Sequence, residues 1–459
     1  MRIRKIYLAA ALLACPALLM MCTKPAPFSD EDYDPRLSGG AATVFDATSK
    51  AFGNVIPGLS NYDQHIHDLG DNSVDQTFVT APATINSGLG PIFNNVSCRS
   101  CHHNDGKGSP TTGTVTSSML MRLSIPGTDA HGGPLAVPGF GLQLQDLAVF
   151  GKTAEASVKI TYTEQVYTYP DGTVTTLRKP TYSFVNPYTT LPVNLMVSPR
   201  MAPPFFGLGL LVMIPESTLL SYADENDANG DGISGRPNYV YDASKDKMML
   251  GRFGMKANTA TILTQAAAAY QQDMGITSRI FPKESSFEQP QTDNLGDDPE
   301  LPDSLLNAVE FYLLSLAVPA RRNTTDGDIM AGEKLFAQVG CSSCHIPTMQ
   351  TGVDVRYPYL SNQRIHAYTD LLLHDMGDGL ADGRPDFKAS GNEWKTPALW
   401  GVGLFEKTNG TPFYLHDGRA RTLEEAILWH DGEAAKAKVK FSQLSAGERG
   451  QMIAFLKSL

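Results

Sequence analysis

The sequence is short of positive charge for its length. Its 459 residues include 37 Lys and Arg against 48 Asp and Glu, so the formal net charge is −11 at pH 7. A protein that binds nucleic acid or an anionic membrane surface would carry an excess of Lys and Arg. We therefore expect no nucleic-acid partner and no electrostatic binding to a membrane.

The apolar run at the N-terminus is too short to cross a bilayer. It covers Ile6–Met21, 16 residues, whereas a transmembrane helix needs about 20. Because Arg2, Arg4 and Lys5 precede it, the run is typical of an export signal over residues 1–22. We expect the protein to be exported to the periplasm or the outer membrane.

Cysteine is scarce, and two of the six cysteines lie in this segment. Cys22 ends the apolar run and is followed by a short polar, Pro-rich stretch, which favours a lipoprotein signal acylated at Cys22. Acylation at Cys15 and simple cleavage are the alternatives. A lipid anchor would be the only membrane attachment.

The other four cysteines form two motifs, Cys98-Arg99-Ser100-Cys101-His102 and Cys341-Ser342-Ser343-Cys344-His345. CxxCH is the attachment signature of c-type haem, in which both cysteines bind the porphyrin covalently and the histidine ligates iron. The sequence therefore predicts two covalently bound haem c groups. Their anchors would be Cys98, Cys101, Cys341 and Cys344, and their proximal iron ligands His102 and His345.

Three other chemistries also use paired cysteines. Four cysteines can hold one zinc ion, each pair can be a thioredoxin-like redox couple, and each can form a disulfide in an exported protein. None of them requires a histidine after each pair. Haem is therefore the interpretation that we favour.

The patterns along the chain predict a mainly α protein with loop-rich regions, a small β-hairpin insertion and two cytochrome c-like haem domains. We expect an N-terminal haem domain over residues 23–325, with the β insertion at about residues 150–190, and a C-terminal haem domain over residues 326–459. In the insertion, apolar and polar residues alternate from Val158, and Pro170-Asp171-Gly172 predicts a turn.

Several blocks of the sequence resemble one family. They are Gly88-Leu89-Gly90-Pro91, Ser198-Pro199-Arg200, Gly207-Leu208-Gly209-Leu210-Leu211, Asp231-Gly232-Ile233-Ser234-Gly235-Arg236, Gly251-Arg252-Phe253-Gly254-Met255-Lys256-Ala257, Leu372-Leu373-His374-Asp375-Met376-Gly377, Thr396-Pro397-Ala398-Leu399-Trp400 and Tyr414-Leu415-His416-Asp417-Gly418-Arg419. Together they resemble the di-haem oxidoreductases, a peroxidase-like family that is also described as thiol oxidoreductase-like. It is related to the bacterial di-haem cytochrome c peroxidases.

The resemblance implies an exported di-haem c-type cytochrome with peroxidase or other oxidoreductase activity. Electrons would enter at the C-terminal haem and pass to a reactive N-terminal haem, where peroxide or another small oxidant is reduced. The acidic chain favours a basic electron-donor protein, such as a small cytochrome or a cupredoxin. The alternatives are a pure electron-transfer cytochrome and an oxidase that acts on a protein substrate.

The resemblance also implies a second iron ligand for the C-terminal haem. In di-haem peroxidases this ligand follows the histidine of the Tyr-x-His-Asp-Gly motif at a fixed distance, and His430 lies at that distance, fourteen residues after His416. A surface histidine near a helix end is the alternative for His430, and Met376 is the second candidate ligand. For the distal side of the N-terminal haem, the candidates are His65, His67, His131 and the glutamate residues.

One further motif suggests calcium. Asp227, Asn229 and Asp231 have the D-x-N-x-D-G spacing that opens a calcium-binding loop, but position twelve, Asn238, is not a carboxylate. A calcium ion and a simple Asx-rich turn are both compatible with this pattern. The three tryptophans, Trp394, Trp400 and Trp429, are predicted to pack against a porphyrin rather than to relay electrons.

Overall fold

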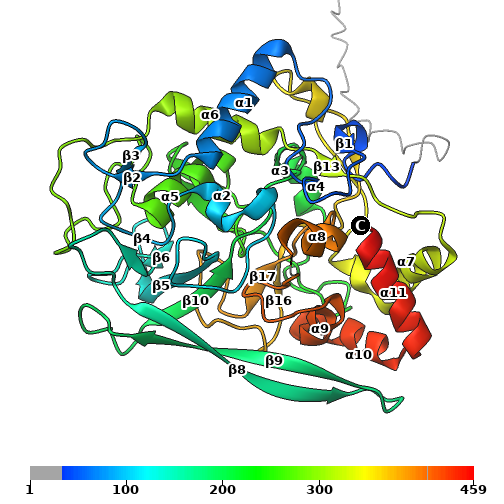
Figure 1. Ribbon diagram of the computed structural model, residues 1–459. Helices are drawn as coiled ribbons and strands as arrows, with labels where there is room; N and C mark the ends of the chain where they lie inside the picture. The colour runs from blue at the N-terminus through cyan, green and yellow to red at the C-terminus, as the bar shows by residue number, and fades with distance from the viewer. Residues whose placement is uncertain (1–33, 411) are drawn as a thin grey trace, which may run out of the picture. The chain divides into compact units, whose positions relative to one another are not determined.

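Helices and strands are mixed along the whole chain, and the strands form several small sheets (Figure 1). The computed structural model describes residues 34–410 and 412–459. The helices are α1 (Asn61–Asp75), α2 (Cys98–Cys101), α3 (Leu208–Val212), α4 (Glu216–Leu220), α5 (Ile262–Met274), α6 (Asp303–Leu314), α7 (Gly327–Val339), α8 (Phe405–Asn409), α9 (Leu423–Trp429), α10 (Ala435–Gln443) and α11 (Ala446–Ser458). The predicted export signal, with Cys15 and Cys22, lies outside the described residues.

The longer strands belong to the central part of the chain. They are β5 (Met119–Thr128), β8 (Ser157–Thr168), β9 (Val174–Val185) and β10 (Met196–Met201), and the short ones are β1 (Thr43–Val44), β2 (Val79–Thr80), β3 (Ser87–Leu89), β4 (Ile92–Phe93), β6 (Pro134–Leu135), β7 (Leu147–Ala148), β11 (Tyr239–Asp242), β12 (Lys247–Leu250), β13 (Val318–Pro319), β14 (Met349–Gln350), β15 (Arg364–Ile365), β16 (Leu373–Asp375) and β17 (Glu393–Lys395). Most of the short strands pair in twos between loops.

The prediction of a mainly α protein is wrong. The structure is 28% helix and 20% strand, and it does not establish two cytochrome c-like domains. The prediction missed the longer strands on either side of the predicted hairpin, β5 and β10. There β5 pairs with β10, and Met119, Met121 and Leu123 alternate into a buried cluster with the period of two that marks a half-buried strand. The predicted boundary between residues 325 and 326 stays a prediction.

The N-terminal part is built on two helices in close contact. Helix α1 packs along α6, and a Cβ atom at Gly70 would lie 2.2 Å from the carbonyl oxygen of Ala308. No larger residue fits there, because the two backbones meet at this point. The apolar run Leu305–Val318 predicts a helix up to Pro319, and the structure ends α6 at Leu314.

The C-terminal part is built in the same way from α7 and α11. A Cβ atom at Gly332 would lie 2.0 Å from the carbonyl oxygen of Gln451. Met452 and Phe455 of α11 are buried in the core beneath. Ser445 and Glu448 form a capping box at the start of α11, as their spacing predicts.

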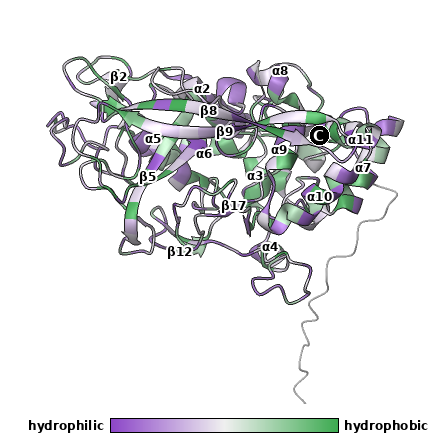
Figure 2. Cartoon of the chain, turned by 90° about the horizontal axis from the view of Figure 1, so that it is seen from below, coloured by the Kyte–Doolittle hydropathy of each residue, from purple (hydrophilic) through white to green (hydrophobic). Residues whose placement is uncertain are grey.

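The predicted hairpin is present as β8 and β9, which pair over their full length. Hydrophilic and hydrophobic residues are mixed along both strands (Figure 2). Near its turn the hairpin reaches the C-terminal part, where Tyr169 donates a hydrogen bond to Glu424 and Arg449 pairs with Asp171. Farther along, Arg178 donates to two backbone carbonyl oxygens of the segment that follows His416.

Among the described residues, no helix is both long enough and apolar enough to span a membrane.

Candidate functional site

The first CxxCH motif folds as the short helix α2, which is fixed to α1 by Arg99. The Arg99 guanidinium forms ion pairs with three carboxylates, those of Asp71, Asp75 and Asp105. Asp105 is buried, and it also accepts a hydrogen bond from the hydroxyl of Tyr312. The second position of the motif therefore anchors the whole motif to the N-terminal helices.

His102 has the surroundings of a metal ligand. Its Nδ1 lies 2.6 Å from the carbonyl oxygen of Pro203, and its ring stacks on Phe205 with centroids 3.9 Å apart. Because a carbonyl oxygen only accepts, Nδ1 must carry the proton. Burial lowers the pKa of His102 to about 4, so the ring is neutral and Nε2 keeps a free lone pair. Ligating histidines usually donate their other N–H to such a partner.

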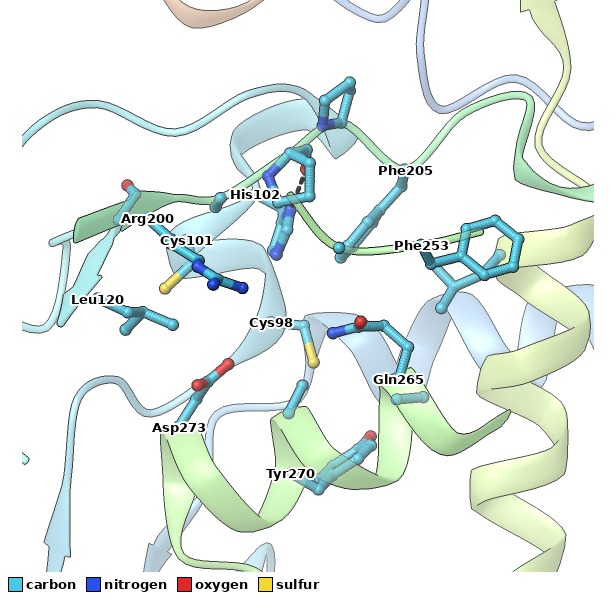
Figure 3. Close-up of a pocket in the computed structure, with 18 of the residues that line it drawn as sticks. Cys98, Cys101, His102, Leu120, Arg200, Phe205, Phe253, Gln265, Tyr270 and Asp273 are labelled. Atoms are coloured by element: carbon cyan, nitrogen blue, oxygen red, sulfur yellow. Dashed lines mark hydrogen bonds between the residues drawn. The ribbon is translucent and has the colours of Figure 1, made fainter. Parts of the chain in front are cut away.

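A cavity opens beside this motif. Gln265, Tyr270 and Asp273, all from α5, lie across it from His102, with Cys98 between them (Figure 3). Between these longer side chains, α5 contributes Ala266 and Ala269 to the wall. These small residues leave room along the helix face, because they extend no further than Cβ.

Several polar groups in this cavity have no partner. The hydroxyls of Ser118 and Tyr270 are buried and make no hydrogen bond within the described chain. The amide of Gln265 makes none either within those residues. Buried polar groups are normally satisfied, so unpartnered ones around a cavity fit a site that holds a polar or charged ligand.

Asp273 and Arg122 add charge to the same cavity. Burial raises the pKa of Asp273, while the charge of Arg122 and a hydrogen bond from Gln143 oppose this shift. Arg200 also lines the cavity and is held by an ion pair with Asp386, 2.8 Å long. A planar acidic cofactor would find cationic groups here without any change of fold.

The surroundings of the four motif cysteines favour neither a redox couple nor a single zinc site. None of them forms a disulfide. Burial raises the pKa of Cys98 to about 12 and that of Cys341 to about 12, whereas thiol redox chemistry needs a lowered pKa. Among the described residues, only one group of side chains close enough to share a metal ion includes a cysteine. It consists of Cys344, Asp370 and His374, so it holds one of the four cysteines. The donor set fits two separate haem groups better.

The second CxxCH motif follows α7 directly, where Gly340 turns the chain with φ of 98°. Nδ1 of His345 lies 2.9 Å from the carbonyl oxygen of Tyr368. Nδ1 of His430, at the end of α9, lies 2.7 Å from the carbonyl oxygen of Ala426. Both rings thus have the same tautomer as His102, with Nε2 free.

His345 and His430 also lie near one another. Burial lowers the pKa of His345 to about 4, and a charge on His430 would lower it further. Burial likewise lowers the pKa of His430. Each of the two histidines thus donates its Nδ1 proton to a backbone carbonyl oxygen and keeps Nε2 available.

The other candidates for the N-terminal distal side lie elsewhere. His65 and His131 are exposed, and His131 stacks on Tyr241. His67 is buried, but its Nδ1 lies 2.7 Å from the hydroxyl of Ser315. None of the three lines the cavity beside His102. Met376, the second candidate for the C-terminal haem, is half-buried next to β16.

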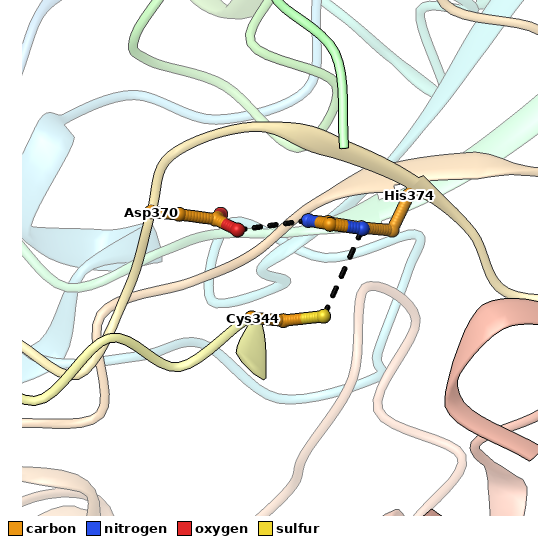
Figure 4. A group of neighbouring side chains, drawn as sticks. All are labelled: Cys344, Asp370 and His374. Atoms are coloured by element: carbon orange, nitrogen blue, oxygen red, sulfur yellow. Dashed lines mark hydrogen bonds and ion pairs between the residues drawn. The ribbon is translucent and has the colours of Figure 1, made fainter. Parts of the chain in front are cut away.

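Beside the second motif lies a buried cluster that the sequence did not single out as a site. His374 is placed between Asp370 and Cys344 (Figure 4). Its Nε2 lies 2.9 Å from Oδ2 of Asp370, and its Nδ1 lies 2.6 Å from Oε2 of Glu433 and 3.7 Å from Sγ of Cys344. Burial opposes ionisation, but the hydrogen bonds to Asp370, Cys344 and Glu433 raise the pKa of His374 to about 12.

The calcium-like loop has its oxygens engaged by the backbone. Both carboxylate oxygens of Asp227 accept from the N–H of Gly232. The amide oxygen of Asn229 and one carboxylate oxygen of Asp231 each accept from the N–H group two residues on. This is the pattern of Asx turns. A calcium ion at this loop stays a prediction.

The tryptophans occupy the region that follows the second motif. Trp394 stacks on His416, and Lys256 approaches the same indole. Trp429 precedes His430, and its buried Nε1 makes no hydrogen bond to any residue that the structure describes. The guanidinium of Arg419 lies 4.8 Å from the centroid of the Trp429 ring.

The sequence signals for the unexpected residues were present but not specific. Gln265 precedes four consecutive alanines on α5, and two of them, Ala266 and Ala269, line the cavity. His374 lies in one of the blocks that carry the family resemblance. Its two carboxylate partners are distant in sequence, so only the fold brings them together.

Comparison with known proteins places this geometry in a family. The profile of the family described as "Di-haem oxidoreductase, putative peroxidase" matches residues 33–459. A comparison with curated proteins found no match.

Two solved structures show weak likeness. One is hydrazine synthase from Kuenenia stuttgartiensis, studied under 20 bar of xenon, with 20% identity and a TM-score of 0.23. That match covers 35% of this chain and 56% of the hydrazine synthase chain, so it spans little more than half of that protein. The other is a MauG-like protein associated with microbial copper homeostasis, with 17% identity and a TM-score of 0.28. That match covers 56% of this chain and 89% of the MauG-like chain. Neither likeness carries an argument.

The family profile covers almost the entire described chain, and two CxxCH motifs with matching histidine surroundings lie inside it. The chain therefore belongs to the di-haem oxidoreductases and is a haem-dependent oxidoreductase.

Proposed function

We propose that the protein is an exported di-haem c-type cytochrome that reduces peroxide, or a similar small oxidant, beside His102. One observation carries this proposal. Among the described residues, His102 is the only histidine that lines its cavity, whereas His345 has His430 as a neighbour. On this proposal the first site is open on one side, and the second has two iron ligands, His345 and His430.

Each site has its own set of residues. Cys98 and Cys101 would anchor one haem c with His102 as its proximal ligand, and Cys341 and Cys344 would anchor the other between His345 and His430. When bound, these groups supply iron that stores electrons and reduces the oxidant. The chain itself provides one histidine, His102, at the first site and two histidines, His345 and His430, at the second.

Peroxide reduction also needs a group that moves a proton near the oxidant. Asp273 fits this role, because burial raises its pKa and its Oδ2 makes no hydrogen bond within the described residues. Gln265 and Tyr270 would orient the oxidant through their unpartnered amide and hydroxyl.

We further propose that electrons enter at the second site from a basic donor protein. The net charge of −11 supports this, since opposite charge speeds the encounter of two proteins. Export, with a lipid at Cys22, belongs to the same proposal. Mass spectrometry of the mature N-terminus would show whether Cys22 is acylated, and a mature chain without Cys22 would exclude the anchor.

The second candidate function is electron transfer without catalysis. Met201, Met255 and Met274 also line the cavity, and a thioether from one of them would close the first site. Cyanide titration of the oxidised protein separates the two functions. Peroxide reduction requires one cyanide-binding, high-spin haem per chain. Two low-spin haems that ignore cyanide in both oxidation states would exclude it.

The haem content comes first in any such test. A pyridine haemochrome assay should report two haem c groups per chain. Steady-state peroxide reduction with a reduced donor should then be lost in His102→Gly. An oxidase that acts on a protein substrate would instead show peroxide-dependent modification of that partner.

A further inference from the structure

A single carboxylate ties together three segments around the second motif. Glu433 lies three residues after His430, in the turn that joins α9 to α10. Its Oε2 lies 2.6 Å from Nδ1 of His374, and its Oε1 accepts the N–H of Asp375 at 3.0 Å. It also accepts both the N–H and the hydroxyl of Ser234, each at 2.9 Å.

His374 continues this connection toward Cys344. Both of its ring nitrogens face carboxylates, Asp370 on one side and Glu433 on the other. A carboxylate only accepts, so both nitrogens must donate, and neither is available to bind iron. The ring also approaches Cys344, whose Sγ lies 3.7 Å from Nδ1.

The surroundings are shaped to keep the ring in place. Cε1 of His374 would lie 2.7 Å from a Cβ atom at position 235, which is why glycine is needed there. The ring, Asp370 and the Glu433 carboxylate are all shielded from solvent. Charge-assisted hydrogen bonds are strong and geometrically strict in such surroundings.

We propose that the Asp370–His374–Glu433 bridge is a positioning device that holds the His430 segment against the second CxxCH motif. It fixes His430 relative to His345, so that neither histidine leaves its place when the oxidation state changes. This inference rests on the proposed function only in taking His430 as an axial ligand. In this proposal the Asp227–Ser234 loop places Ser234 where its N–H and hydroxyl donate to Glu433.

The test is carbon monoxide binding to the reduced full-length protein, together with EPR of the oxidised form. Wild type should bind one equivalent per chain and show one low-spin bis-histidine signal. Glu433→Ala should bind one additional equivalent and lose that signal, because His430 is released. His374→Ala, at the other end of the bridge, should do the same, and Glu433→Gln should restore part of the wild-type behaviour.

Lys436→Ala is the matched control. Lys436 lies on the next turn and contacts the same loop, donating to the carbonyl oxygen of Asp231 at 2.6 Å, but it does not touch His374. Lys436→Ala should bind the same number of carbon monoxide equivalents as wild type. A haemochrome assay checks that each variant carries two haems; if His374→Ala does not, Glu433→Ala decides.

The outcomes separate the two proposals. If Glu433→Ala binds no additional carbon monoxide and keeps the low-spin signal, the bridge has no positioning role. If wild type already binds two equivalents, His430 is not a firm ligand, and both the bridge and the proposed ligation are wrong. If wild type binds none but Glu433→Ala gains one, the bridge is supported and the open first site is wrong.

Discussion

The indole of Trp394 lies flat on the imidazole of His416, with ring centroids 3.7 Å apart and 10° between the planes. The Trp394 Nε1 donates to the carbonyl oxygen of Leu380 at 3.0 Å, and the ammonium of Lys256 lies 4.6 Å from the centroid of the indole. The ring is therefore fixed by a stack, a hydrogen bond and a cation at once. The buried lysine is the most vulnerable part of this arrangement.

Replacing Lys256 should destabilise the fold strongly. Its side chain is wholly buried, and Nζ donates to Asp382 at 2.8 Å and to two backbone carbonyl oxygens. Lys256→Met leaves the Asp382 carboxylate buried without its cation, which costs roughly 3–5 kcal/mol. Urea unfolding of the haem-loaded protein measures this. Lys152→Met, which removes one bond to a carbonyl oxygen, should change stability by less than about 1 kcal/mol; equal losses would contradict the argument.

Removing His430 should change the spectrum of one haem only. In His430→Ala the bis-histidine EPR signal should disappear, and the reduced protein should bind one more equivalent of carbon monoxide. His366→Ala controls for the loss of a buried histidine near the same motif, since its Nδ1 lies 2.9 Å from the hydroxyl of Thr348. An unchanged spectrum in His430→Ala would remove it as a ligand.

Filling the alanine face of α5 should close the first site. Ala269→Leu places a branched side chain in the cavity, and we expect cyanide affinity to fall at least about tenfold, or about 1.4 kcal/mol. Ala268→Leu is the control, because Ala268 lies next to it on α5 but does not line the cavity. If both variants bind cyanide as wild type does, α5 does not face the ligand.

Glu155 should make stability depend on pH. Burial raises its pKa from 4.5 to about 8, against the hydrogen bonds from Gln145 and Gln289. Between about pH 4.5 and pH 8, the Glu155 carboxyl keeps its proton in the folded protein but has lost it in the unfolded chain. Stability should therefore fall as the pH rises through this window, by up to about 1.4 kcal/mol per pH unit.

The variant Glu155→Gln tests this dependence. It should lose that part of the slope and be more stable than wild type at pH 8, but not at pH 5. Glu164→Gln, on the exposed hairpin, should leave the slope unchanged. A wild-type stability that is flat between pH 5 and pH 8 would contradict the prediction.

The local features could be predicted from the sequence. The β8–β9 hairpin followed from alternation around Pro170-Asp171-Gly172, and the capping box of α11 from the spacing of Ser445 and Glu448. Both depend on residues close in sequence. The CxxCH histidines are also local, and the structure gives His102 and His345 the backbone partners expected of ligands, although ligation itself stays a prediction.

Features that depend on distant segments could not be predicted. The pairing of β5 with β10 joins residues more than seventy positions apart, in a chain whose local patterns predict a mainly α protein. Histidines and glutamates are the distal candidates that the sequence suggests, yet Gln265 and Asp273 line the cavity. No spacing rule connects His374 to Glu433, because only the folded chain brings their segments together.

The hairpin has a mechanical consequence for the whole molecule. The base of the hairpin packs on the buried cluster that contains Met121. Arg178 in β9 donates a hydrogen bond to the carbonyl oxygen of Arg419, and Asp171 in the turn forms an ion pair with Arg449 near the C-terminus. Any separation of the C-terminal helices from the rest must break these contacts. Heating should therefore melt the N-terminal and C-terminal regions in one cooperative step, and a fragment of residues 326–459 alone should melt at a lower temperature than the same residues within the full chain.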